Sequence, residues 1–329
     1  MAGIFDRNPF AVLGASTCDD VHRLAQLADD AALFGDDGAE EAFDALTHSM
    51  RRLDAELRWM PGETAKTARE IMAYSKRKEP SPYPDLSGMS AMAKFSACRA
   101  LLETWIVDDT QSALALVSSL SAAWDGVHAQ DVMEQLNAER SRAGVPLIAE
   151  IEEVYDRIDA LLSQVADDLL ARAEKAGVSA CAIAGGAAER YAATRGRLPE
   201  ALVNAYAAAA AQEESELRKS LCETCAQILN CKLAQKGALL GEKIAPELAR
   251  WSETTRPMRM LLAAKGREDT RVFELYRELY RAASHLNNAC SQHRLCAKLF
   301  RRYDEVFFDL PSVKEHLQKN LAIVESVAR

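Results

Sequence analysis

This chain of 329 residues is poor in the residues that interrupt helices and in those that favour strands. It holds 15 glycines and 10 prolines, which gather at segment boundaries, and its β-branched residues are sparse while alanine is abundant. Alanine favours helix, whereas β-branched residues favour strand. We therefore predict an all-α protein. With 49% hydrophobic residues, the chain can build sizeable cores in two or three compact units.

The sequence also lacks the signals of export and of membrane insertion. No apolar run approaches the ~18 residues that a membrane span needs. Residues 1–7 do not form a basic region followed by an apolar stretch, so no secretory signal is visible. The eight cysteines are scattered rather than set at disulfide-framework spacings. We expect a cytoplasmic protein with reduced thiols.

Common catalytic signatures are missing as well. The chain contains no G-x-x-x-x-G-K-[ST], G-x-G-x-x-G, G-x-S-x-G or H-E-x-x-H motif. Carboxylate pairs such as Glu152–Glu153 fall on polar helix faces, where they read as solvated charge. We therefore predict that the protein is not an enzyme and uses no cofactor.

The charge is acidic and unevenly placed. The net charge is −9, and residues 1–62 hold twelve acidic and five basic residues, which gives −7 for that segment alone. An acidic chain gains nothing from counterion release at nucleic acid or from an anionic membrane surface. We expect neither as a partner, and the acidic N-terminal segment would favour a basic protein.

Residues 8–62 show the pattern of a short helix followed by a helical hairpin. Residues 8–14 form a first short element, and the next helix carries an apolar face that ends near Gly35. A second stripe then continues in steps of 3 and 4 as one helix until Pro61–Gly62, through Phe43, Leu46, Met50, Leu53 and Leu57. Two such stripes across a short loop predict an antiparallel helical hairpin.

This order of elements, opened by Asn8-Pro9-Phe10 and Leu13-Gly14 and closed by residues 51–59, resembles a bacterial subset of J-domain-like proteins. The resemblance covers about residues 8–60 and implies a J-like fold joined to helical, repeat-like regions. J-domains stimulate DnaK-type chaperones through a His-Pro-Asp loop and a basic second helix. Here the loop reads Leu-Phe-Gly-Asp-Asp-Gly and the helix is acidic, so no functional residue of the family carries over.

Four segments follow from the boundaries. We predict a degenerate J-like domain at 1–62, a polar helix with a proline-rich linker at 63–88, a helical-hairpin domain at 89–176 and a long-helix bundle at 177–329. Three prolines in five positions, from Pro80 to Pro84, mark the linker.

The C-terminal half is expected to be a long antiparallel bundle or coiled coil. One apolar series with heptad-like steps runs from Ile148 to Leu169, and a second runs from Val272 to Phe300 within one helix over 268–308. Between them we expect one long helix over about 200–236 and a shorter one over 242–263. The expected interruptions are Gly185–Gly186, Gly237 and Gly241, and Pro257 is expected to kink or break the shorter helix.

Two spacings are compatible with zinc. Cys222 and Cys225 form a C-x-x-C, while Cys290, His293 and Cys296 form a C-x-x-H-x-x-C. On antiparallel neighbouring helices these side chains could form a tetrahedral set. His293 and Cys296 also continue the apolar series, and a buried cysteine packs as a small hydrophobe. We therefore predict no metal site and keep a zinc-stabilised helical protein as an alternative.

The favoured function is a non-enzymatic adaptor or scaffold for protein–protein interaction. We expect a protein partner, with a basic surface as one option and self-association through the heptad helices as another. A co-chaperone with a non-standard trigger at Asp36–Asp37 is the other alternative. The candidate interaction residues are Asp29, Asp30, Asp36, Asp37, Tyr276 and Tyr280.

Overall fold

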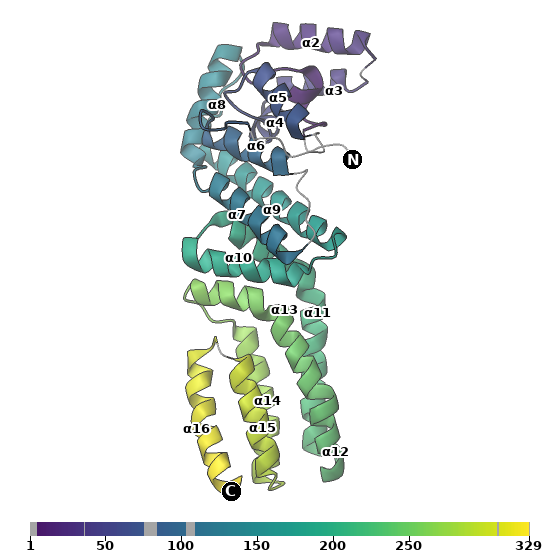
Figure 1. The fold of residues 1–329 in the computed structure, drawn as a ribbon, viewed down its shortest axis with the longest axis vertical. Helices are drawn as coiled ribbons and strands as arrows, with labels where there is room; N and C mark the ends of the chain where they lie inside the picture. Colours follow the sequence, from purple (N-terminus) through teal and green to yellow (C-terminus); the bar gives the residue numbers. More distant parts are fainter. Residues whose placement is uncertain (1–4, 36, 76–83, 103–108, 308, 329) are drawn as a thin grey trace. The chain divides into compact units, whose positions relative to one another are not determined.

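The computed structural model describes residues 5–35, 37–75, 84–102, 109–307 and 309–328. Every regular element in these residues is a helix, and none of them forms a strand, which confirms the predicted all-α class. The chain divides into two compact units (Figure 1). Unit 1 comprises Met1–Ser179 and Gly196–Ala201, and unit 2 comprises Ala180–Arg195 and Leu202–Arg329.

Unit 1 is built from short and medium helices. In chain order they are α1 (Pro9–Leu13), α2 (Val21–Leu33), α3 (Ala39–Thr47), α4 (Ser49–Leu57), α5 (Ala65–Ser75), α6 (Ala91–Leu102), α7 (Thr110–Trp124), α8 (Ala129–Ala143) and α9 (Ile151–Lys175).

The Asn-Pro-Phe opening has a structural explanation. The Asn8 side chain accepts a hydrogen bond from the Phe10 N–H at 3.0 Å and donates to the Ala55 carbonyl at 2.9 Å. Pro9 occupies the first turn, where its missing N–H costs nothing. Phe10 is fully buried and stacks on Trp59 with ring centroids 6.3 Å apart. The motif therefore caps α1 and fixes it to the core.

The prediction of one continuous second helix in the hairpin is wrong, because this segment forms two helices, α3 and α4. His48 separates them with an extended backbone (φ −89°, ψ 119°). The Thr47 hydroxyl donates to the carbonyls of Phe43 and Asp44, and the His48 N–H also donates to the Asp44 carbonyl at 3.1 Å, where α3 ends. Leu46, Leu53 and Leu57 are nevertheless buried as expected.

One hydrophobic core of unit 1 draws buried residues from both ends of this region, from Phe5 to Leu101. Helix α5, predicted to be polar, buries Ala68 and Ile71 in it, and α6 adds Ala93 and Ala97. The first three predicted segments thus belong to one compact unit, while the predicted boundary at 176/177 lies beside the boundary between the units at 179/180. Of the predicted linker, residues 76–83 lie outside the described residues.

The apolar series of α9 is used inside unit 1. Helix α9 packs against α8 and α4, and Val154, Ile158, Leu162 and Val165 are buried. Tyr155, which belongs to the predicted series, is exposed. The buried stripe is therefore rotated slightly from the predicted one, because it must face two neighbours rather than one.

Unit 2 contains most of the longest helix, α11, which has 34 residues. The elements of unit 2 are α10 (Ala180–Thr194), α11 (Arg197–Asn230, whose first residues belong to unit 1), α12 (Leu233–Ala238), the π-helical turn η1 (Leu239–Ile244), α13 (Ala245–Ala264), α14 (Thr270–Asn288), α15 (His293–Val306) and α16 (Pro311–Ala328). The predicted long helix over 200–236 is confirmed in α11, although it ends at Asn230.

Several predicted interruptions do not interrupt. Gly185 and Gly186 lie inside α10, Gly237 lies inside α12, Gly241 lies inside η1, and α13 runs through Pro257. Glycine and proline weaken a helix locally, but tertiary packing of the helix outweighs a cost on the order of 1–3 kcal/mol. In α10 that packing is against α13, where Ala184, Ala187 and Ala188 are fully buried.

The predicted single helix over 268–308 is a hairpin of α14 and α15. Ser291 adopts a left-handed backbone (φ 51°), and the Asn287 carboxamide oxygen lies 2.8 Å from His293 Nδ1 across the turn. Tyr303 then reaches back to the Leu279 carbonyl at 3.4 Å. Helices α14, α15 and α16 lie side by side in Figure 1, and α15 packs on both neighbours.

Candidate functional site

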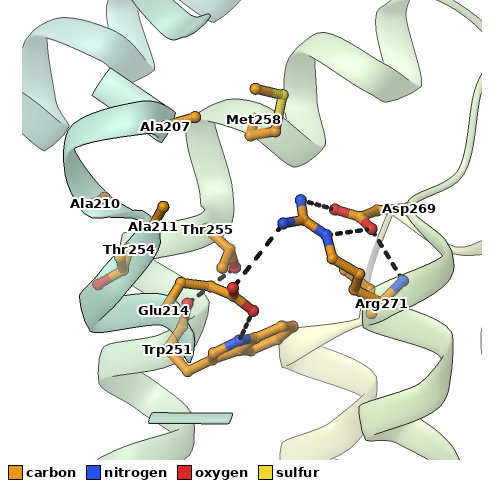
Figure 2. Close-up of a pocket in the computed structure, with 11 residues that line it drawn as sticks. Ala207, Ala210, Ala211, Glu214, Trp251, Thr254, Thr255, Met258, Asp269 and Arg271 are labelled. Carbon is orange, nitrogen blue, oxygen red and sulfur yellow. Dashed lines mark hydrogen bonds and ion pairs between the residues drawn. The ribbon is translucent and has the colours of Figure 1, made fainter. Parts of the chain in front are cut away.

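A small pocket in unit 2 lies between α11, α13 and the start of α14 (Figure 2). Its volume is about 60 Å³. Ala207, Ala210 and Ala211 line it from α11, and their methyl groups leave the space open. The other lining residues are Glu214, Trp251, Thr254, Thr255, Met258, Asp269, Arg271 and Val272.

The charged groups of the pocket are paired with one another. Glu214 accepts a hydrogen bond from Trp251 Nε1 at 3.3 Å, and its second oxygen lies 3.9 Å from the Arg271 guanidinium. Arg271 also forms an ion pair with Asp269 at 2.8 Å. Asp269 caps α14, because its side chain accepts from the Arg271 N–H at 3.0 Å. The dashed lines in Figure 2 trace this network.

The pKa shifts of Asp269 and Arg271 favour the ion pair between them. Burial by itself would raise the pKa of Asp269, but hydrogen bonds from Arg271 and the charges of Arg271 and Arg259 lower it overall. The hydrogen bond to Asp269 in turn raises the pKa of Arg271. Arg259 lies over the Trp251 ring at 5.5 Å and pairs with Asp309. Asp269 is thus held as the partner of a cation rather than as a proton acceptor for a substrate.

The geometry suits a stabilising network more than a reaction centre. A space of about 60 Å³ has room for a few water molecules and is too small for a drug-sized ligand. On the α11 side of the pocket, Ala207, Ala210 and Ala211 contribute only methyl groups. A catalytic base would need a free acceptor within reach of a substrate proton.

The cysteine and histidine candidates do not gather. Cys225 and Cys296 are buried in one core, where burial raises the pKa of Cys225 to about 12 and that of Cys296 to about 11. Cys222 and Cys290 are half-buried, and His293 bonds to Asn287. Among the described residues, no three His, Cys, Asp or Glu side chains form a group that could hold a metal ion.

Tyr276 and Tyr280, predicted as surface anchors, are engaged within the chain. Tyr276 is buried, and its hydroxyl lies 2.8 Å from His316 Nδ1 on α16. Tyr280 stacks on Phe300 at 5.7 Å and donates to Asn320 at 3.2 Å. Both rings hold α16 against α14, which leaves little of Tyr276 for a partner.

The acidic candidates lie on the surface. Asp29, Asp30 and Asp37 are exposed, whereas Asp36 lies outside the described residues. Two residues at the end of α2, which lie between Asp30 and Asp37 in the chain, were not predicted from the sequence. Leu33 is 84% exposed and Phe34 is 92% exposed.

The position of this pair is fixed by the end of the helix. The Phe34 N–H donates to the carbonyls of Asp30 and Ala31, at 3.2 and 3.1 Å, and Gly35 turns the chain with φ 84°. A left-handed residue after the last turn is a common helix end. The signal was available in the sequence, because Leu33 and Phe34 fall off the apolar face that Leu24 and Ala28 mark.

We call these two residues the Leu33–Phe34 tip. Large apolar side chains with this exposure, set among charged neighbours, are typical of interaction surfaces.

No family model, no curated protein and no solved structure matches this chain. Within the described residues, no helix has both the length and the apolar character that crossing a membrane requires.

Proposed function

We propose that this protein is a non-enzymatic adaptor or scaffold of the cytoplasm that binds other proteins through its J-like N-terminal segment. The observation that carries the proposal is the exposure of Leu33 and Phe34, at 84% and 92%. Burying one such side chain in a partner contributes about 1.5–3 kcal/mol.

The charge around the tip indicates which partner fits. Residues 19–41 contain eight acidic residues and one basic residue, Arg23. Asp29, Asp30 and Asp37 are exposed next to the tip. A partner with an apolar cavity and a basic rim would match this surface, since complementary charges speed encounter and select against acidic partners.

The paired charges of the unit 2 pocket support the non-enzymatic part of the proposal. Glu214, Asp269 and Arg271 already bind one another. The loss of His-Pro-Asp and the reversed charge of α2 argue against stimulation of a DnaK-type chaperone. We expect no change in the ATP turnover of such a chaperone when the full chain is added.

Affinity capture with the full chain tests the proposal. We expect at least one stoichiometric partner, either another protein or a second copy, that is lost with the double variant Leu33→Ser, Phe34→Ser. Leu147→Ser is the matched control, because Leu147 is also an exposed leucine of unit 1, at 55%. A chain that captures no partner and stays monomeric would contradict the proposed function.

A further inference from the structure

A second surface feature lies in unit 2, at the end of α11 and along α12. An open groove of about 610 Å³ runs there, and its lining is mainly apolar and uncharged. We call it the α12 groove, defined by Gln227, Asn230, Cys231, Ala234, Gln235, Ala238 and Leu239. Leu233, the first residue of α12, is 50% exposed beside it.

The charge near this groove is opposite to that of the tip. Residues 227–243 contain Lys232, Lys236 and Lys243 and one acid, Glu242. Lys232 follows the groove residue Cys231, and Lys243 lies about one turn after Leu239. Both lysines are exposed. Lys236 is buried, with its Nζ 2.9 Å from His285 Nε2. The exposed charges of this segment are thus two lysines and Glu242, a net charge of +1, which gives the apolar groove a weakly basic margin.

We propose that the Leu33–Phe34 tip of one copy docks into the α12 groove of a second copy. This inference rests on the proposed function and names the partner as the chain itself. Two features of the protein carry it: an apolar tip in an acidic surround, and an apolar groove with a basic margin. Both surfaces are apolar, their surrounding charges are of opposite sign, and each is open to solvent in the described structure.

The pairing is head-to-tail. The tip belongs to unit 1 and the groove to unit 2, so the two surfaces that meet are different. Such a heterologous contact leaves a free tip and a free groove at the ends, and it grows into a ring or an open filament. The average mass of the assembly should therefore rise with protein concentration beyond that of a dimer. Salt should weaken self-association, because it screens the charges around the tip and the groove.

Light scattering and sedimentation of the purified full chain test the proposal. The tip variant is Leu33→Ser with Phe34→Ser, and the groove variant is Ala234→Glu, which adds bulk and negative charge at an exposed groove residue. We expect each variant to raise the dissociation constant of self-association on the order of 100-fold. Leu147→Ser and Gln318→Glu, matched substitutions at exposed positions elsewhere, should leave it unchanged.

Mixing the two variants gives the sharper result. The tip variant keeps its groove and the groove variant keeps its tip, so an equimolar mixture should form a dimer and grow no further. Far-UV circular dichroism confirms that each variant is folded. A mixture that stays monomeric while the unmodified chain assembles would overturn the docking model, as would assembly that ignores the tip variant.

The outcomes separate this inference from the proposed function. If the unmodified chain is monomeric at every concentration but captures another protein through the tip, the docking of copies is wrong and the adaptor function stands. If it is monomeric and captures nothing, both are wrong.

Discussion

Arg140 and Glu56 form an ion pair at 2.8 Å although 84 residues separate them in the chain, and neither side chain is more than 1% exposed. Arg52 binds the same carboxylate at 2.8 Å from one turn earlier on α4. Both guanidiniums also donate to backbone carbonyls, Arg52 to Thr17 and Arg140 to Pro146. This buried group joins α4 to α8 and to the chain before α2.

The first prediction concerns this group. Glu56→Gln keeps the shape of the side chain and removes the charge that two buried guanidiniums share. We expect the free energy of unfolding of unit 1 to fall by about 3 kcal/mol or more, because breaking a buried ion pair leaves a charge without compensation. Urea denaturation followed by circular dichroism measures the loss.

Glu70→Gln on α5 is the control for that variant, since its partner Lys66 is 3.9 Å away and both side chains are exposed. An exposed pair contributes at most ~1 kcal/mol. Equal losses for Glu56→Gln and Glu70→Gln would show that the buried group does not stabilise unit 1.

The second prediction concerns the pocket of unit 2. Glu214→Ala removes the acceptor of the buried Trp251 indole N–H and leaves Arg271 with Asp269 alone. An unsatisfied buried donor costs about 1–3 kcal/mol. We expect the urea midpoint of unit 2 to fall accordingly. Glu216→Ala on the same helix, at an exposed residue, should have little effect and corrects for helix propensity.

The third prediction compares two glycines. Gly144 ends α8 with φ 65°, a left-handed backbone that a side chain strains, so Gly144→Ala should destabilise by about 1 kcal/mol. Gly185 lies inside α10 with open space around the position of a Cβ, so Gly185→Ala should stabilise by about 0.5–1 kcal/mol. Thermal unfolding should move in opposite directions for the two variants. A shift of the same sign in both would refute the prediction.

The fourth prediction is a loss of stability at alkaline pH. Burial raises the pKa of Cys225 to about 12 and of Cys296 to about 11, from an ordinary thiol value of 9.0. Above pH 9 the unfolded chain releases protons that the folded chain retains, so stability falls as the pH rises toward 11–12. Burial also raises the pKa of Tyr276 and Tyr303, which acts in the same direction.

Urea midpoints measured between pH 8 and pH 11, in steps of about one pH unit, test this prediction. The double variant Cys225→Ala, Cys296→Ala should show a shallower decline across that range, whatever its stability at pH 8. The control is the half-buried Cys18 of unit 1, because Cys18→Ala should keep the full alkaline slope of unit 2.

The sequence predicted the class of the fold and most helices because both depend on local patterns. The apolar series Val313, Leu317 and Val324 indicates the helix that the structure shows as α16, and all three side chains are buried in the core. The same local patterns could not tell one helix from two. The 3 and 4 steps continue from α14 into α15 although the chain reverses at Ser291, because both helices face the same core.

What the sequence determined by itself was helical content, the acidity of the N-terminal segment and the lack of familiar catalytic motifs, since composition and short periodicities are enough for these. Tertiary structure alone decided that Tyr276 holds α16 instead of facing solvent, and that Leu33 and Phe34 protrude. It also decided that Glu56 meets Arg140. Burial and long-range pairing depend on which faces meet in three dimensions, and that choice minimises the exposed apolar area and uncompensated charge of the whole chain rather than of any one helix.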